Sequence, residues 1–384
     1  MKTKRKILFT MVLLLGFFLT STIAQPQFRN KINFPDILGY KSLKCDFHTH
    51  TVFSDGNVWP TYRVEEAWRD GLDVIALTDH LEYQPHKDYL PSNHNAPVQI
   101  AKNLANELGI TLIQGAEITR KMPPGHLNAI FVTDGNALVK DDWKESILEA
   151  KKQGALLFWN HPSWVAQQPD GIAKWYPEHD WIMETGILFG LEVYNANVYS
   201  PETHQWCIDK NLAVIGNSDV HDPLYFEWEA ENVAHRPITL VFAKNNSPES
   251  IREALLERRT TIWYDQKLIG DEKFLKEIYN KSISIDKNKI SALGRESKPM
   301  LITNNSDVAY DLKLVSEDTR IQFPKEMKLM ANRTLKFSVR AAKEDAAVKG
   351  KVKAVYEIKN MITAPGKTLE VTYEFDFDIE PNKK

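Results

Sequence analysis

Short apolar stretches alternate with stretches of helical period along much of the chain. Apolar runs that we expect to form buried strands cover residues 43–47, 73–78, 110–115, 127–132, 155–159, 186–193, 212–216 and 238–242. Helical patterns separate them at residues 60–70, 98–108, 143–153, 203–210 and 248–258. Strands that alternate with helices in this way predict a parallel sheet. With about seven strands, we expect an α/β fold whose sheet closes into a barrel, and an open doubly wound sheet is the alternative.

The pattern changes in the C-terminal part of the chain. Along residues 369–377 apolar side chains alternate with Glu, Thr and Asp, and residues 352–358 and 335–339 repeat this alternation. A period of two is typical of half-buried antiparallel strands. We therefore predict a separate β-sandwich at residues 284–384, and a bridging segment with a helical middle at residues 262–282.

The N-terminus has the pattern of an export signal. Four basic residues precede an apolar run at residues 7–19, and small residues follow before Gln25. Because this run is short for a membrane span, we predict a cleavable signal peptide at residues 1–24 and a periplasmic or secreted protein. An uncleaved membrane anchor is the alternative. The barrel domain with its bridging helix is then expected at residues 25–283, and its first residues, up to residue 42, as an exposed lead-in.

Charge, hydropathy and cysteine content limit the partners, the membrane spans and the disulfide bonds that we expect. Losing the basic residues of the leader lowers the formal net charge from −3 to about −7, and the sequence has no clustered basic face. We therefore expect no nucleic acid partner. No other apolar run has spanning length, so the mature protein is predicted to lack a membrane span. The two cysteines, Cys45 and Cys207, are too few for a disulfide framework and are expected to be small buried residues.

The segment at residues 45–56 holds the first candidate chemistry. Residues two apart on a strand point to the same face, so His48 and His50 present two imidazoles side by side. The Ser-Asp-Gly sequence that follows favours a turn, which would bring the carboxylate of Asp55 back towards the two rings. Two imidazoles and a carboxylate form half of a metal site.

Further histidines and carboxylates stand at or just beyond the predicted strand ends. With the first three they are His48, His50, Asp55, Asp79, His80, Glu117, His126, His161, Asp219 and His221. In a parallel barrel these ends open on one face, so we predict a site for two or three divalent metal ions. Imidazole and carboxylate donors without Cys suit Zn, Mn or Fe. Two neighbouring ions bridged by a carboxylate such as Glu117 are suited to displacement at phosphorus.

In type and order these residues resemble a known family. The motifs are His48-x-His50, Ser-Asp55-Gly, Thr-Asp79-His80, Glu117, His126, Asn-His161-Pro and Asp219-x-His221. They resemble the PHP (polymerase and histidinol phosphatase) superfamily of metal-dependent phosphoesterases across residues 43–265. The export signal and the β-rich tail make the chain similar to the secreted phosphodiesterases of the Sb-PDE type. The resemblance implies a distorted (β/α)7 barrel in which metal-bound hydroxide attacks a small phosphoester substrate.

The resemblance also implies three ligand sets. The first ion would be held by His48, His50, Glu117 and Asp219. The second would share Glu117 and add His126 and His161, and the third would take Asp55, His80 and His221. Some relatives have His at the position of Asp55, where this chain has another plausible ligand.

Three more residues are candidates for roles beside the metals. Asp79 is expected to orient a neighbouring ligand through a hydrogen bond. Glu192, in the sequence Leu-Glu-Val-Tyr-Asn, is either a catalytic group or a buried structural carboxylate. Arg120 is either a clamp for the substrate phosphate or an ordinary surface residue.

Two other functions compete with the phosphoesterase hypothesis. Amidohydrolases also open with His-x-His on a barrel strand, but their bridging group is typically a modified Lys where this chain has Glu117. A non-catalytic periplasmic binding protein, with the sandwich as its contact surface, is the second alternative. Ligands on nearly every strand favour an enzyme. Nothing in the pattern indicates an oligomeric state.

Overall fold

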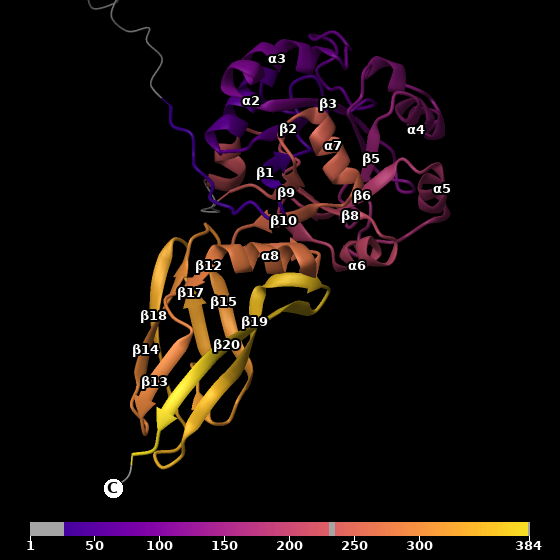
Figure 1. Cartoon of the computed structure of the whole chain (residues 1–384). Coiled ribbons are helices and arrows are strands. Elements are labelled where there is room, and N and C mark those ends of the chain that lie inside the picture. The colour runs from indigo at the N-terminus through magenta and orange to yellow at the C-terminus, as the bar shows by residue number, and fades with distance from the viewer. Residues whose placement is uncertain (1–26, 230–234, 383–384) are drawn as a thin grey trace, which may run out of the picture.

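The computed structural model describes residues 27–229 and 235–382. It has two domains, an α/β domain and a β-sandwich, with helix α8 (Glu272–Ser282) between them (Figure 1). The predicted signal peptide lies outside the described residues. Within the described ranges, no helix is long and apolar enough to cross a membrane.

A ring of strands forms the centre of the α/β domain. Within the described residues these strands are β1 (Lys41–Asp46), β2 (Val74–Leu77), β3 (Thr111–Ile118), β4 (Leu127–Ile130), β5 (Leu156–Trp159), β6 (Leu188–Asn195) and β8 (Ala213–Asn217). Each pairs with the next in this order. Just beyond β8 and β1 the ring closes, because Asp219 N donates to His48 O and His50 N donates to Val220 O, at 2.9 and 3.0 Å. The predicted distorted seven-stranded barrel is confirmed.

The prediction of parallel strands is wrong at two places. β4 runs antiparallel to both β3 and β5, and β9 (Ile238–Ala243) pairs antiparallel with the outer edge of β1. The loop of residues 119–126 joins β3 to β4 directly, without the crossover helix that a parallel connection needs. As a consequence, the residue that precedes β4 lies at the same end of the barrel as the residues that follow β3 and β5.

Helices surround the ring (Figure 1). They are α2 (Pro60–Arg69), α3 (Ala96–Leu108), α4 (Trp143–Lys152), α5 (Pro177–Thr185), α6 (Pro201–Asp209) and α7 (Pro248–Leu256). Most begin with proline at an early helical position, and α3 ends at Gly109, whose φ of +70° suits glycine. The sequence did not predict α5, because its inner face buries His179 beside Ile182 and the apolar period is therefore weak.

The barrel sheet continues into the sandwich. β9 pairs with β10 (Thr260–Tyr264), which forms a hairpin with β11 (Lys267–Gly270), and β11 pairs with β19 (Val348–Ala364) of the sandwich. The predicted helical middle of the bridging segment is α8, which buries Phe274, Leu275 and Ile278. A continuous sheet and a shared apolar core therefore connect the two domains.

The sandwich has the alternation that the sequence predicted. One sheet contains β12 (Ile283–Ile285), β14 (Lys298–Asn304), β18 (Arg333–Ala341) and β16 (Ile321–Gln322). The facing strands are β13 (Lys289–Leu293), β15 (Tyr310–Glu317), β17 (Glu326–Leu329), β19 and β20 (Lys367–Glu380). On β20 the side chains of Leu369, Val371, Phe375 and Phe377 are buried, whereas their neighbours face outwards.

The lead-in is not the exposed segment that we expected. Ile37 is fully buried, and the ring of Phe34 packs edge-on against Trp263 at 4.8 Å between centroids. Asn33 N donates to Asp307 Oδ2 of the sandwich at 2.7 Å. The segment before β1 therefore joins the core that the two domains share.

Candidate metal centre

The structure brings all nine predicted ligands together at one end of the barrel. His48 and His50 follow β1, His80 follows β2, and Glu117 is near the end of β3. His161 follows β5, and Asp219 and His221 follow β8. His126 precedes β4, and it joins the others because β4 runs in the opposite direction.

Four atoms form the first group. His48 Nε2 and His50 Nε2 lie 3.0 Å apart, each is 3.0 Å from Asp219 Oδ1, and each is 3.4 Å from Glu117 Oε2. Ligands about 2.0–2.1 Å from a shared zinc-like ion, in tetrahedral geometry, lie roughly 3.3 Å from one another. The spacing therefore fits His48, His50 and Glu117 as donors to one cation, and Asp219, the fourth residue of the first predicted set, lies beside both imidazoles.

The second group is built on the other oxygen of Glu117. His126 Nδ1 lies 2.8 Å from Glu117 Oε1, and His161 Nε2 lies 3.7 Å from the same oxygen. Asn160 Nδ2 donates to this oxygen at 2.9 Å, so the carboxylate is fixed between the two groups. His80 Nδ1 also approaches Glu117, at 2.9 Å from Oε2, although the predicted second set did not include it.

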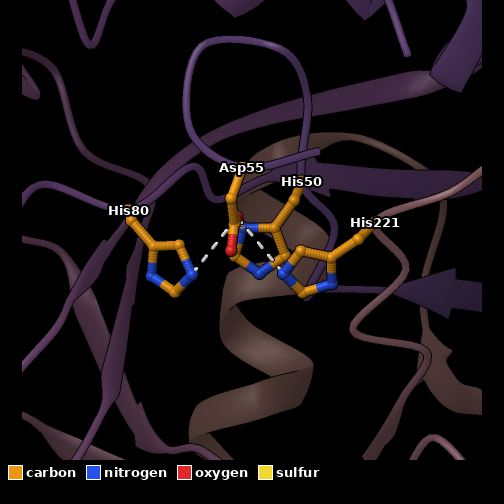
Figure 2. Close-up of side chains that lie close together, drawn as sticks. All are labelled: His50, Asp55, His80 and His221. Carbon is orange, nitrogen blue, oxygen red and sulfur yellow. Dashed lines mark ion pairs between the residues drawn. The ribbon is translucent and has the colours of Figure 1, made fainter. Parts of the chain in front are cut away.

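The third group surrounds Asp55 (Figure 2). Its Oδ1 lies 3.4 Å from His80 Nε2 and 3.3 Å from His221 Nε2. His50 presents its second nitrogen, Nδ1, 3.8 Å from the same oxygen, and its ring stacks on that of His221 at 4.1 Å between centroids. His50 therefore contacts both the first and the third groups, which the predicted sets did not anticipate.

Several of these atoms are buried and lack a hydrogen-bond partner, which is the strongest sign that the site is built for cations. Asp55 Oδ1, Glu117 Oε2 and His126 Nδ1 are in this state. Their neighbours lie close, but none of these contacts has the geometry of a hydrogen bond. Buried polar atoms are normally satisfied, and a divalent ion would satisfy these. With imidazole and carboxylate donors, the residues present fit Zn, Mn or Fe.

The charges of the cluster are strongly coupled. Burial favours neutral carboxyl groups, but the surrounding imidazoles outweigh it and hold the pKa values of Glu117 and Asp219 well below their usual range. Burial and the neighbouring charges of His221 and His80 lower the pKa of His50 to about 3. Burial also opposes the charged form of His80, yet Glu117 and Asp55 raise its pKa to about 10. Protons supply the positive charge that the carboxylates require, and metal binding would release them.

Glu192 orients two of the predicted ligands. Its Oε1 lies 2.8 Å from His48 Nδ1 and accepts from Asn217 Nδ2, while its Oε2 accepts from the backbone N of His161 at 2.7 Å. Because a carboxylate accepts, Nδ1 of His48 carries the proton and the lone pair of Nε2 faces the first group. The backbone of His161 is held at a φ of +30°, and that of Asp219 at +55°, conformations that require support from their surroundings.

The carboxylate of Asp79 does not touch the cluster, but supports the turn that carries part of it. Its carboxylate accepts from Thr51 N and from Ser54 Oγ, both at 2.8 Å, and Ser54 Oγ lies 3.3 Å from His50 Nδ1. The turn is tight, since a Cβ on Gly56 would lie 2.7 Å from the backbone of His50. Asp79 therefore acts on a predicted ligand through Ser54.

Arg120 is directed away from the cluster. Its Nη2 lies 2.8 Å from Glu82 Oε1, and its guanidinium also donates to the carbonyl oxygens of Lys140 and Asp141. These acceptors are on loops at the rim of the barrel. The clamp hypothesis requires a guanidinium that is free to bind the substrate phosphate, whereas that of Arg120 is already engaged.

Sequence reasoning missed Arg63 on α2, which is fully buried. Its guanidinium donates to the carbonyl oxygens of His50 and His221 at 3.0 and 3.1 Å, and pairs with Glu66 at 2.7 Å. It thereby ties the loop after β1 to the loop after β8. No local pattern distinguishes it from an exposed arginine on an amphipathic helix, so only the tertiary structure identifies it.

Comparison with known proteins gives consistent results. The family model for the PHP domain matches residues 46–248, and a model for an Ig-like domain matches residues 283–374. A crystal structure of a two-domain protein containing a predicted PHP-like metal-dependent phosphoesterase, from Bacteroides vulgatus, is 44% identical. That match covers 91% of this chain and 100% of the other, with a TM-score of 0.86.

Two curated proteins match parts of the chain. An uncharacterized protein of Methanocaldococcus jannaschii is 35% identical over 192 residues, which are 47% of this chain and 83% of that protein. A 5'-3' exoribonuclease of Haemophilus influenzae is 37% identical over 76 residues, which are 20% of this chain and 23% of that protein.

Proposed function

Because the chain belongs to the PHP domain family, we propose that it is a metal-dependent hydrolase of phosphoesters, exported as a phosphodiesterase or phosphomonoesterase with a trinuclear site. One observation carries the proposal. Both oxygens of Glu117 are shared among imidazoles, because His48 and His50 each lie 3.4 Å from one oxygen and His126 lies 2.8 Å from the other. A carboxylate in this position suits neighbouring cations, as hydrolysis at phosphorus requires.

The chain's own residues have distinct tasks in this reaction. His48, His50, Glu117 and Asp219 would hold one ion, Glu117, His126 and His161 a second, and Asp55, His80 and His221 a third. When bound, such ions supply acidified water and neutralise the charge of the phosphoryl group. Glu192 keeps the proton of His48 on Nδ1, so that Nε2 is available to the site. Asp79 and Arg63 position backbone and side chains and do not touch substrate.

The site distinguishes this proposal from its two rivals. At the end of β3, where amidohydrolases typically have a modified Lys, this chain has Glu117. A carboxylate shared between two cations leaves coordination positions on those cations open for a substrate. An enzyme uses such open positions, whereas a binding protein does not need them. For export, the support is the leader pattern of basic, apolar and small residues.

The first test is elemental analysis of the purified mature protein, with assays on bis(p-nitrophenyl) phosphate and p-nitrophenyl phosphate. We expect two or three metal ions per chain and turnover of at least one ester. His48→Ala should lose both metal and turnover. His204→Ala is the matched control, since it removes an equally buried imidazole from α6, where the ring bonds to Tyr199. It should keep the metal ions and the activity.

Other outcomes would overturn the proposal in defined ways. Metal-loaded protein that hydrolyses neither ester would favour the binding protein, and activity on amides alone would favour the amidohydrolase. Export is tested separately by N-terminal sequencing of the protein recovered outside the cytoplasm. A start at Gln25 is expected, and an intact leader would contradict cleavage.

A further inference from the structure

Two exposed aromatic rings border the ligand groups. The indole of Trp164 is 44% exposed and its centroid lies 5.1 Å from the ring of His161 and 5.6 Å from that of His126. The ring of Tyr83 is 53% exposed and lies 6.0 Å from that of His80. The two rings come from different loops, after β5 and after β2, and both stand beside candidate metal ligands.

Packing does not account for these two rings. By contrast, Trp175 and Trp181 pack against the apolar core of the barrel domain. Trp164 and Tyr83 belong to none of the apolar cores formed by the described residues. Exposed aromatic side chains beside a polar site present a flat apolar face on which the ring of a ligand can stack.

The position of Trp164 is set before any ligand arrives. Its backbone N donates to His161 O at 2.9 Å, and its own carbonyl oxygen accepts from the backbone N of Gln167 and of Gln168 at 3.0 and 2.7 Å. The indole therefore stands on a closed turn that begins at a candidate ligand. Because the backbone is already fixed, only the side-chain torsions of Trp164 lose freedom when the indole stacks on a ligand.

We infer that the preferred substrates are phosphoesters whose ester group carries an aromatic or heteroaromatic ring, and that this ring stacks on Trp164, with Tyr83 as a weaker second wall. The inference rests on the proposed function. Because the indole lies beside His126 and His161, an ester group carried by a phosphoryl group at these ligands would be within reach of the indole. Aromatic contacts of this kind correspond to roughly a 3- to 10-fold gain in affinity.

The test compares two non-hydrolysable phosphonates, phenylphosphonate and methylphosphonate, by calorimetric titration of metal-loaded protein. Trp164→Ala should weaken phenylphosphonate binding roughly 3- to 10-fold and leave methylphosphonate binding unchanged. Trp164→Phe keeps a ring and should retain most of the difference. Tyr83→Ala should have the same selectivity with a smaller effect. Elemental analysis of each variant checks that the metal ions remain.

Kinetics provide an independent measurement. For phenyl phosphate and ethyl phosphate, kcat/KM of Trp164→Ala is divided by that of the wild type, so that the intrinsic reactivity of each ester cancels. The quotient should fall for the phenyl ester alone. Equal losses for both esters, or loss of metal in Trp164→Ala, would overturn the inference, because the indole would then only support His126 and His161. Unchanged affinities for both phosphonates would overturn it as well.

The two proposals fail in distinguishable ways. If the wild-type protein binds methylphosphonate and hydrolyses esters but shows no aromatic preference, the further inference is wrong and the phosphoesterase proposal stands. If it binds neither phosphonate and hydrolyses no ester, the proposed function itself is wrong.

Discussion

The mouth of the barrel, which is the end that holds the predicted ligands, buries polar and charged side chains, whereas the sandwich buries apolar ones. At the mouth, His48, His50 and Glu117 are fully buried together with unpartnered polar atoms. In the sandwich, the buried residues of β20 are apolar, and its charges face outwards. Burying charge costs free energy unless a partner compensates it, whereas burying apolar surface stabilises the fold. One region is therefore arranged for chemistry, whereas the other stabilises the fold.

The two regions are also at opposite ends of the barrel. The hairpin of β19 and β20 reaches a cavity of about 400 Å³ that is lined by Leu212 and Thr260, near the starts of β8 and β10, and by Thr363 and Lys367 of the hairpin. The predicted ligands follow the other ends of the strands. Changes in the sandwich should therefore alter stability, and changes at the mouth should alter activity.

The largest effect is expected for Glu117→Gln. This change keeps the shape but removes the charge shared by two ligand groups, so activity should fall on the order of a thousandfold or more and metal content should drop. Turnover assays with elemental analysis measure this, and circular dichroism checks that the fold persists. A variant that keeps its metal ions and a tenth of its turnover would contradict the role of Glu117.

Phe377→Ala should have the converse effect. The ring is 1% exposed and packs beside Phe323 and Phe375, so its loss should lower the free energy of unfolding by about 3–5 kcal/mol. Turnover per folded molecule should not change. Urea unfolding measures the first quantity. Lys349→Ala, on the outer face of the same sheet, serves as control and should cost less than about 0.5 kcal/mol. Lost turnover with unchanged stability would refute the division of roles.

Glu192→Gln tests the support of the ligands. Glutamine keeps the length of the side chain, but it is a weaker acceptor for the proton of His48. Metal affinity or activity should fall about 10- to 100-fold. Titration of metal-free protein with Zn or Mn gives the affinity. Glu184→Gln, an exposed residue of α5, makes the same chemical change away from the site and should have no effect. Equal behaviour of the two variants would leave Glu192 without a positioning role.

The smallest effect is expected for Arg120→Ala. Because its guanidinium is engaged by Glu82 and by loop carbonyl oxygens, kcat/KM for phosphoesters should change less than about threefold. Arg252→Ala is matched, since Arg252 also donates to a loop carbonyl oxygen, that of Gly154. A fall of thirtyfold in Arg120→Ala alone would show that this side chain turns to the substrate, as the clamp hypothesis requires.

Local patterns predicted most of the elements and the residues that meet at the site. The period of two along β20 and the apolar runs of β2, β5 and β8 recur in the structure, because burial on one or both faces constrains residue type at each position. The histidines and carboxylates at strand ends were recognisable for a similar reason. A residue at the end of a barrel strand lies at the mouth of the barrel, whatever the conformation of the loop that follows.

Features that depend on contacts between distant segments of the chain became clear only from the tertiary structure. The direction of β4, the burial of Arg63 and the double contact of His50 arise from pairings across the barrel, and no nearby residue encodes them. The packing of the lead-in on the sandwich has the same origin. The periodicity of a segment indicates which of its faces is buried on average. The features named above depend instead on which distant residue contacts one particular side chain or strand edge. The candidate donors could therefore be named from the chain alone, whereas their grouping around shared oxygens required the fold.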